Sequence, residues 1–149
     1  MVFKTHSVQE TEKKAAELAL SLYERQDSPR FIALDGDLGV GKTAFARGFT
    51  AALNPKASVK SPTFALVREY PNGDRSVYHF DMYRIESEED LYSIGFDDYL
   101  ERPGFFLVEW ADRISYAFPD HLLHITIKKD PSETDGRSIE IEEIGGTGG

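Results

Sequence analysis

The stretch Gly36-Asp37-Leu38-Gly39-Val40-Gly41-Lys42-Thr43 matches the pattern G-x-x-x-x-G-K-[ST], in which a glycine-rich loop wraps a phosphate group. The glycines allow successive backbone N–H groups to turn toward the anion. The Lys42 side chain is then expected to reach the β- and γ-phosphates, and the Thr43 hydroxyl to bind Mg²⁺. A helix that begins near Lys42 would also direct the positive end of its dipole, about half an elementary charge, at the anion.

The flanking residues have the pattern that this loop requires. Residues 31–34, Phe-Ile-Ala-Leu, form a short apolar run typical of a buried strand. The residues after the loop place Phe45 and Phe49 on one side of a helix, and Ala52 or Leu53 falls on the same side. Strand, loop and helix in this order predict a nucleoside triphosphate site. The expected contact residues are Asp37, Leu38, Gly39, Val40, Gly41, Lys42, Thr43 and Ala44.

Length and composition indicate one soluble globular domain. The chain has 149 residues, of which 40% are hydrophobic and 29% charged. We expect residues 1–144 to form a single P-loop domain and the Gly-rich residues 145–149 to be a disordered tail. No apolar run approaches the ~20 residues of a membrane span, and the N-terminus lacks a signal-peptide pattern. We therefore expect a cytoplasmic protein with no membrane partner.

The charge and the absence of cysteine exclude further classes. The formal net charge is −9, whereas a protein that grips a nucleic-acid backbone is usually basic. Lys13-Lys14 and Lys128-Lys129 are only pairs, and we interpret them as solvated faces. Direct nucleic-acid binding is therefore disfavoured. The absence of cysteine excludes disulfides and thiolate metal sites.

A helix is predicted ahead of the first buried strand. Ser7 and Glu10 fit a capping box, in which two side chains satisfy backbone N–H groups at the start of a helix. The helical pattern continues to Tyr23, and Ser28-Pro29 ends the segment. We expect this amphipathic helix to lie on the sheet, with a patterned face made of Val8, Thr11, Ala15, Leu18 or Ala19, and Leu22.

The second half of the chain departs from a simple alternation of strands and helices. Residues 65–70 and 76–80 indicate a β-hairpin around the dipeptide Asn72-Gly73. This antiparallel element predicts an α/β, P-loop NTPase-like, three-layer fold with a mixed, partly antiparallel central sheet. A short helix is expected to begin within residues 87–91, and further strands are expected at residues 105–108, 122–127 and 138–144.

Two acidic residues are candidates for the chemistry that accompanies a P-loop. Glu109 ends the apolar strand of residues 105–108, where P-loop proteins carry a carboxylate on the metal side of the nucleotide. Asp81 shares one face with His79 and Tyr83 if residues 79–83 continue as a strand. That polar face suits a group that orients the attacking water or a metal-bound water, and it equally suits an edge strand with no catalytic part.

Other positions carry weaker signals. Ser61 and Thr63 follow the P-loop helix at the distance where nucleotide switches carry a threonine that senses the γ-phosphate, although an ordinary turn has the same pattern. Trp110, the only tryptophan, directly follows Glu109; we interpret it as a core residue that is well placed as a reporter. The three histidines other than His79 have no spacing typical of a metal site, and we interpret them as structural or surface residues: His6, His121 and His124.

Four segments together resemble the bacterial TsaE family, also called YjeE or YdiB. They are the P-loop at residues 36–43, Ser-Pro-Thr-Phe at 61–64, His-Phe-Asp-Met-Tyr-Arg at 79–84, and Val-Glu-Trp at 108–110. The segments follow the order and approximate spacing of the family and cover most of the chain. Members of this family are small P-loop ATPases required for threonylcarbamoyladenosine at position 37 of tRNA. The Val40 position, where alanine is common, contributes mainly backbone.

The resemblance implies a set of ligands and roles. ATP and Mg²⁺ would be the ligands, with Thr43 and Glu109 holding the metal. Lys42 and Asp81 would support the hydrolysis of ATP. The resemblance also places three residues elsewhere around the nucleotide: Ser61 and Thr63 in a switch-like loop, and Thr11 near the base.

The resemblance further implies the proteins TsaD and TsaB as partners. In this family TsaD carries out the transfer chemistry, and TsaE hydrolyses ATP to keep the complex turning over. tRNA would then be met mainly indirectly, through the complex, which agrees with the acidic net charge of this chain.

Two other functions stay open on the residues alone. A small-molecule kinase uses the same loop but normally closes a group of arginines over the phosphates, and the arginines here are scattered. An ATP-gated adaptor with negligible turnover is the second alternative. A GTP-specific switch is disfavoured, because residues 127–130, Ile-Lys-Lys-Asp, lack the asparagine of the N-K-x-D motif. Without an obvious arginine finger, whose addition is worth roughly 10³–10⁵ in rate, we expect slow ATP hydrolysis that a partner raises.

Overall fold

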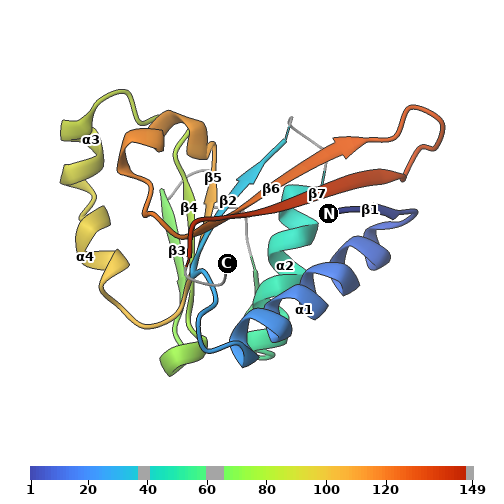
Figure 1. Ribbon diagram of the computed structural model, residues 1–149, viewed down its shortest axis with the longest axis horizontal. Coiled ribbons are helices and arrows are strands. Elements are labelled where there is room, and N and C mark those ends of the chain that lie inside the picture. The colour runs from blue at the N-terminus through green and yellow to red at the C-terminus, as the bar shows by residue number, and fades with distance from the viewer. Residues whose placement is uncertain (37–40, 60–65, 147–149) are drawn as a thin grey trace.

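The fold is a mixed seven-stranded sheet with helices on both faces (Figure 1). A computed structural model of the chain describes residues 1–36, 41–59 and 66–146. The strand order is β1-β7-β6-β2-β5-β4-β3. The central strands β6, β2, β5 and β4 run parallel, while β3, β7 and β1 pair antiparallel. The strands are β1 (Val2–Thr5), β2 (Phe31–Asp35), β3 (Val67–Tyr70), β4 (Val77–Asp81), β5 (Phe105–Glu109), β6 (Leu122–Lys129) and β7 (Arg137–Ile144).

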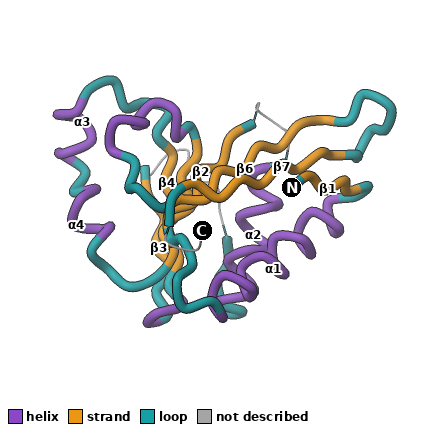
Figure 2. Tube along the Cα trace, in the orientation of Figure 1, coloured by secondary structure: helices purple, strands orange, loops and turns teal. Residues whose placement is uncertain are grey.

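The helices complete three layers, with the sheet between them (Figure 2). One face of the sheet is covered by α1 (Val8–Glu24) and α2 (Lys42–Leu53). The other face is covered by α3 (Glu88–Ser93), α4 (Phe96–Leu100) and a 3₁₀ segment, η2 (Ala111–Ala117). Strands β2 and β5 are buried on both faces, which explains their uninterrupted apolar sequences.

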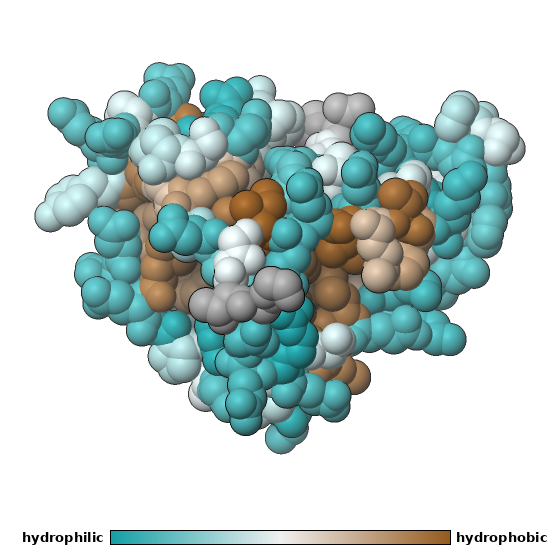
Figure 3. Space-filling model, in the orientation of Figure 1, coloured by the Kyte–Doolittle hydropathy of each residue, from teal (hydrophilic) through white to brown (hydrophobic). Residues whose placement is uncertain are grey.

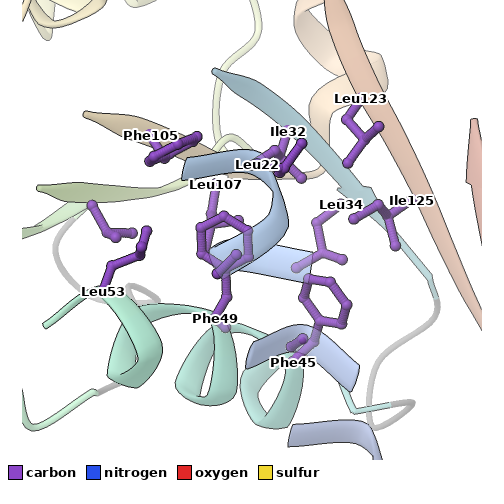
Figure 4. Close-up of a cluster of buried hydrophobic side chains, with 14 of the residues drawn as sticks. Leu22, Ile32, Leu34, Phe45, Phe49, Leu53, Phe105, Leu107, Leu123 and Ile125 are labelled. Carbon is purple, nitrogen blue, oxygen red and sulfur yellow. The ribbon is translucent and has the colours of Figure 1, made fainter. Parts of the chain in front are cut away.

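The core under α1 and α2 follows from helical and strand periodicity. Phe45, Phe49 and Leu53 lie along one side of α2 and point toward the sheet (Figure 4). Leu34 of β2 and Leu107 of β5 meet them from the sheet. The predicted helical face of α2 is therefore confirmed, with Leu53 in the buried position and Ala52 only partly buried.

Side chains fix the ends of these helices. The Ser7 hydroxyl accepts a hydrogen bond from the Glu10 N–H at 3.1 Å, as the capping box predicts, while the Glu10 carboxylate accepts from the His6 N–H. At the C-terminal end of α2, the Asn72 side-chain amide donates a hydrogen bond to the Leu53 carbonyl at 2.9 Å. The hairpin loop between β3 and β4, which contains the 3₁₀ turn η1 (Gly73–Arg75), thus also caps α2.

Most predicted elements are present, and three were missed. The hairpin, the buried strands and the helix that starts after Ser87 are confirmed. The predicted buried face of α1 is confirmed at Thr11, Ala15, Ala19 and Leu22, but Val8 is 48% exposed because it lies in the first turn. Strand β1, helix α4 and segment η2 were not predicted. Residues 147–149 of the expected tail lie outside the described residues, so its disorder stays a prediction.

The face of the molecule seen in Figure 3 is mainly hydrophilic, and apolar residues reach it in separate patches between hydrophilic ones. Within the ranges that the structure describes, no helix is both long and apolar enough to cross a membrane.

Helices α1 and α2 approach each other very closely at Gly48. A Cβ atom at this position would lie 2.1 Å from the carbonyl oxygen of Glu12, which belongs to the α1 backbone. No side-chain rotation relieves a clash with backbone, so the absence of a side chain at Gly48 determines how α2 is seated against α1.

We expect Gly48→Ala to destabilise the protein. In an exposed helix interior the same change stabilises by roughly 0.5–1 kcal/mol, because glycine is the poorer helix former. Here overpacking, which typically costs about 1–3 kcal/mol, opposes that gain and exceeds it. The measurement is the urea midpoint of unfolding followed by circular dichroism. A midpoint above that of the wild-type protein would contradict the close approach.

A surface cluster ties the end of α1 to the sheet. The Arg25 guanidinium donates to both carboxylate oxygens of Glu143 at 2.7 and 3.1 Å, and the His121 ring lies 3.0 Å from the same carboxylate. The hydrogen bond from Arg25, followed by that from His121, lowers the pKa of Glu143 to about 2. The ionised Glu143 therefore stabilises the folded state above its ordinary pKa of 4.5, and this contribution is lost as the pH falls toward 2.

We expect Glu143→Gln to flatten the pH dependence of stability between about pH 5 and pH 2, because the substituted amide does not titrate. Urea unfolding at a series of pH values measures this. Glu142→Gln, at the neighbouring exposed position on β7, is the matched control and should keep the wild-type slope. Equal slopes for both variants would show that the cluster does not depress the Glu143 pKa.

Candidate nucleotide-binding site

Three carboxylates end three neighbouring parallel strands at one edge of the sheet. Asp35 ends β2, Asp81 ends β4 and Glu109 ends β5. In the parallel register Glu109 is the partner of both Leu34 and Asp81, so Asp81 and Glu109 point to the same face. That face is the one covered by α2, which begins at this edge. Open α/β sheets bind their ligands here, outside the carboxyl ends of the strands.

The start of α2 places Lys42 in this edge. Gly41 precedes the helix with φ +108°, a left-handed conformation that favours glycine. Lys42 follows as the first helical residue and is only 6% exposed. Its Nζ atom lies 3.8 Å from Oε1 of Glu109 and 4.8 Å from the centroid of the Trp110 ring. Thr43 is half-buried and Ala44 is buried in the same first turn.

Glu109 is buried and held from two sides. Its Oε2 atom lies 2.6 Å from Nε2 of His79 on β4, and its Oε1 atom faces Lys42. His79 itself is completely buried. A strand-end glutamate that merely faced solvent would need neither contact. The arrangement therefore fits the interpretation of Glu109 as a site residue.

Asp81 lies at the same edge but is less buried. Its Oδ1 atom accepts a hydrogen bond from the Tyr83 N–H at 2.9 Å, and its own N–H donates to the Leu66 carbonyl at 2.9 Å. Strand β4 ends at Asp81, so the predicted strand face does not continue to Tyr83, which is exposed in the turn that follows. The turn forms because the Asp81 carboxylate binds the backbone two residues on.

Trp110 turns the chain sharply after Glu109. Its φ is 56°, and no other non-glycine residue in the described part of the chain has a positive φ. This conformation costs on the order of 1–2 kcal/mol. The ring, only partly buried, lies between the Lys42 ammonium and the Tyr83 ring, whose centroid is 4.9 Å away. Tyr83 in turn contacts the Arg113 guanidinium at 5.0 Å.

The geometry agrees with the result of a comparison with known families. Residues 5–139 match the family model described as "Threonylcarbamoyl adenosine biosynthesis protein TsaE". The chain belongs to the TsaE family. The predicted resemblance is therefore confirmed.

Individual members of the TsaE family resemble most of the chain. It is 40% identical over 114 residues to the tRNA threonylcarbamoyladenosine biosynthesis protein TsaE of Bacillus subtilis, covering 76% of this chain and 70% of that one. The protein of the same name from Haemophilus influenzae is 35% identical over 129 residues, covering 87% and 78%. A crystal structure of Bacillus subtilis YdiB superposes with a TM-score of 0.74 at 31% identity, covering 97% and 86%. This similarity and the mixed sheet confirm the predicted fold class.

The structure brings together some of the residues predicted for this TsaE-family site. Lys42 and Glu109 are in contact, and Asp81 is adjacent to Glu109 across the sheet. Thr11 is buried on α1, where its hydroxyl hydrogen-bonds that of Thr5 at 2.8 Å; within the described ranges its hydrogen bonds do not reach Lys42 or Glu109. Six further predicted residues lie outside the described part of the chain: Asp37, Leu38, Gly39 and Val40 of the loop, and Ser61 and Thr63.

Sequence reasoning missed three features of the site. The hydrogen bond of His79 to Glu109 was not foreseen, nor was the pairing of His124 on β6 with Asp35 on β2. The proximity of Arg137 on β7 to the start of α2 was also missed: a Cβ atom added at Gly41 would lie 3.9 Å from the Nε atom of Arg137. Each pairing joins segments that are distant in the chain. Among these three features, only that of His79 had a usable signal in the sequence, through its alternation with Asp81 along the strand.

A cavity of about 290 Å³ marks the same edge of the sheet, lined by Asp35, Gly36, Lys42, Trp110 and Asp112. Two larger cavities lie away from it, one between α1 and β7 and the other beside α3 and α4. The smaller cavity is the one lined by the lysine at the start of α2 and by the Trp110 ring that this lysine contacts.

Proposed function

We propose that this protein binds ATP with Mg²⁺ and hydrolyses it slowly, in the cytoplasm, in support of the threonylcarbamoyladenosine modification of tRNA by TsaD and TsaB. The observation that carries the proposal is Lys42. It is buried at the start of α2, with its ammonium between the Glu109 carboxylate and the Trp110 ring. The names of the Bacillus and Haemophilus relatives support the pathway.

In this proposal the phosphates lie against the loop and the start of α2. The backbone of the loop and Ala44 would cradle them, while the Lys42 ammonium would leave Glu109 to pair with the β- and γ-phosphates. Thr11 would lie near the base and Ser61 and Thr63 near the γ-phosphate, as the family resemblance implies. The loop residues in this role are Asp37, Leu38, Gly39, Val40 and Gly41.

The donor set suits Mg²⁺. Thr43 supplies a hydroxyl in the first turn of α2, and Glu109 supplies a carboxylate at the end of β5. Both are oxygen donors, which Mg²⁺ prefers. We assign these two residues to the ion. When bound, it would neutralise negative charge on the phosphates during transfer to water.

Asp81 is the residue that we assign to the attacking water. It lies next to Glu109 at the sheet edge, and the hydrogen bond from the Tyr83 N–H to Oδ1 fixes the carboxylate. The second oxygen, Oδ2, is the one that we assign to water. A carboxylate in this place can orient water and accept its proton.

The predicted slow rate and the partner follow from the arginines and the charge. Arg47 pairs with Glu12 and Arg102 with Glu69, both at ion-pair distance on the surface. These two guanidinium groups are committed elsewhere, and an arginine supplied by a partner would be worth roughly 10³–10⁵ in rate. The net charge of −9 favours a protein complex over tRNA as the direct contact.

Nucleotide binding should depend on Lys42 and be visible in Trp110. Adding ATP and Mg²⁺ should change the tryptophan fluorescence saturably, because the Lys42 ammonium leaves the ring of the only tryptophan. Lys42→Ala should abolish this response or weaken the affinity severely. Lys128→Ala, on an exposed part of β6, is the control. Unchanged affinity in Lys42→Ala would refute the phosphate site.

Hydrolysis should depend on Asp81 and rise with the partners. Phosphate release is measured for the protein alone and with TsaD and TsaB, with Lys42→Ala as the blank. We expect slow turnover that increases with the pair. Asp81→Ala should bind ATP as the wild-type protein does and lose turnover.

Other outcomes have distinct meanings. Normal hydrolysis by Asp81→Ala would remove Asp81 from the mechanism. Binding without hydrolysis in both conditions would favour an ATP-gated adaptor. Transfer of phosphate to a small hydroxyl acceptor in place of water would favour a kinase.

A further inference from the structure

His79 is a fully buried histidine that the proposed chemistry leaves without a role. It lies on β4, on the face covered by α1 and α2, where it is paired with Leu107 of β5 on one side and with Arg68 of β3 on the other. One ring nitrogen, Nε2, lies 2.6 Å from Oε2 of Glu109. The other, Nδ1, is buried and has no hydrogen-bond partner within the described residues. A buried polar group with an unsatisfied atom is costly, so its presence calls for an explanation.

We propose that His79 is a positioning residue that holds the Glu109 carboxylate in the orientation needed for Mg²⁺. The inference rests on the proposed function, since it assigns Glu109 to the ion. The hydrogen belongs on Nε2, because a hydrogen on Nδ1 would be buried without an acceptor in the part of the chain that the structure describes. His79 then donates to Oε2 and leaves Oε1 directed at the sheet edge.

The backbone determines this geometry. His79 is paired with Leu107 and Asp81 with Glu109, so His79 and Glu109 are one side-chain repeat apart on the same face of adjacent strands. The imidazole ring spans that offset. A flexible glutamate held by a rigid ring on the neighbouring strand has lost most of its rotational freedom before any ion arrives.

The contact of Glu109 with Lys42 is longer than its contact with His79, and this difference shows what the His79 ring prevents. Oε1 is 3.8 Å from the Lys42 ammonium, which is too far for a hydrogen bond. Oε2, in contrast, lies within hydrogen-bond distance of His79. Without a donor on Oε2, the carboxylate would turn to satisfy both oxygens from Lys42. The lysine would then be bound to Glu109 and withheld from the phosphates. His79 therefore keeps Glu109 satisfied while Lys42 is free to move.

The test separates a positioning role from a structural one by the effect of Mg²⁺ on nucleotide affinity. The non-hydrolysable analogue adenosine 5′-(β,γ-imido)triphosphate is titrated by calorimetry with Mg²⁺ and with EDTA. We expect Mg²⁺ to raise the affinity of the wild-type protein at least tenfold. His79→Leu should lose this enhancement, so that its affinities with Mg²⁺ and in EDTA differ by less than about threefold, while the tighter pairing of Lys42 with Glu109 lowers its affinity in both conditions. A structural role would instead weaken binding equally in both conditions.

Two further variants complete the design. His79→Gln keeps an N–H donor near the reach of Nε2 and should restore most of the Mg²⁺ effect. Thr50→Val removes the buried Thr50 hydroxyl on α2, which likewise has no hydrogen-bond partner in the described residues, and should behave as wild type. Retention of the full Mg²⁺ enhancement in folded His79→Leu would overturn the proposal. Failure of the wild-type protein to bind the analogue at all would instead refute the proposed function.

A measurement on the wild-type protein covers the case in which His79→Leu does not fold. The ¹⁵N shifts of the His79 ring in a histidine-labelled sample report which nitrogen carries the hydrogen. We expect hydrogen on Nε2 and none on Nδ1, with a shift of the Nε2 signal when Mg²⁺ joins the nucleotide complex. Hydrogen on Nδ1 alone, or no response to Mg²⁺ in a sample that binds the analogue, would overturn the proposal.

Discussion

The burial of the Glu109 carboxylate is the constraint on which the rest of the site depends. Removing a carboxylate from water costs several kcal/mol unless partners replace the lost hydration. Here one partner comes from β4 and the other from the first turn of α2. The contact is therefore made only if β4 and β5 pair in the observed register and α2 begins at the observed place. A shift of β4 by one residue would point His79 to the opposite face and leave Glu109 without its closest donor.

The position of α2 is fixed by three separate parts of the chain. Gly41 permits the left-handed turn that precedes the helix, Gly48 allows close contact with α1, and Asn72 of the distant hairpin loop binds the last carbonyl. Of these three residues, only Gly41 belongs to the phosphate-binding motif. Together they set the direction in which the first N–H groups of α2 point, which is the property that anion binding at a helix start requires.

Much of the fold could be predicted, because it follows from local rules. The apolar runs of β2 and β5, the caps of α1 and α3 and the period of α2 are all short-range patterns. Strand β1 was missed because only pairing with β7 makes it a strand, and α4 because it has only five residues. The same division holds in the site. Lys42, Glu109 and Asp81 follow from motifs, whereas the hydrogen bond of His79 to Glu109 and the proximity of Arg137 to Gly41 arise from tertiary structure.

The proposed function and the proposed role of His79 together explain how one lysine can serve two states. In the structure Lys42 contacts Glu109 and Trp110, so in the proposed function a bound nucleotide would draw its ammonium away from both. That movement would leave a buried carboxylate without a partner if Lys42 were its sole contact. Because His79 binds the second oxygen, Glu109 would remain hydrogen-bonded when the lysine leaves, and a bound Mg²⁺ would supply positive charge in place of the ammonium. In this proposal the buried histidine lowers the energetic penalty of the exchange, and an apolar residue of similar size would not do so.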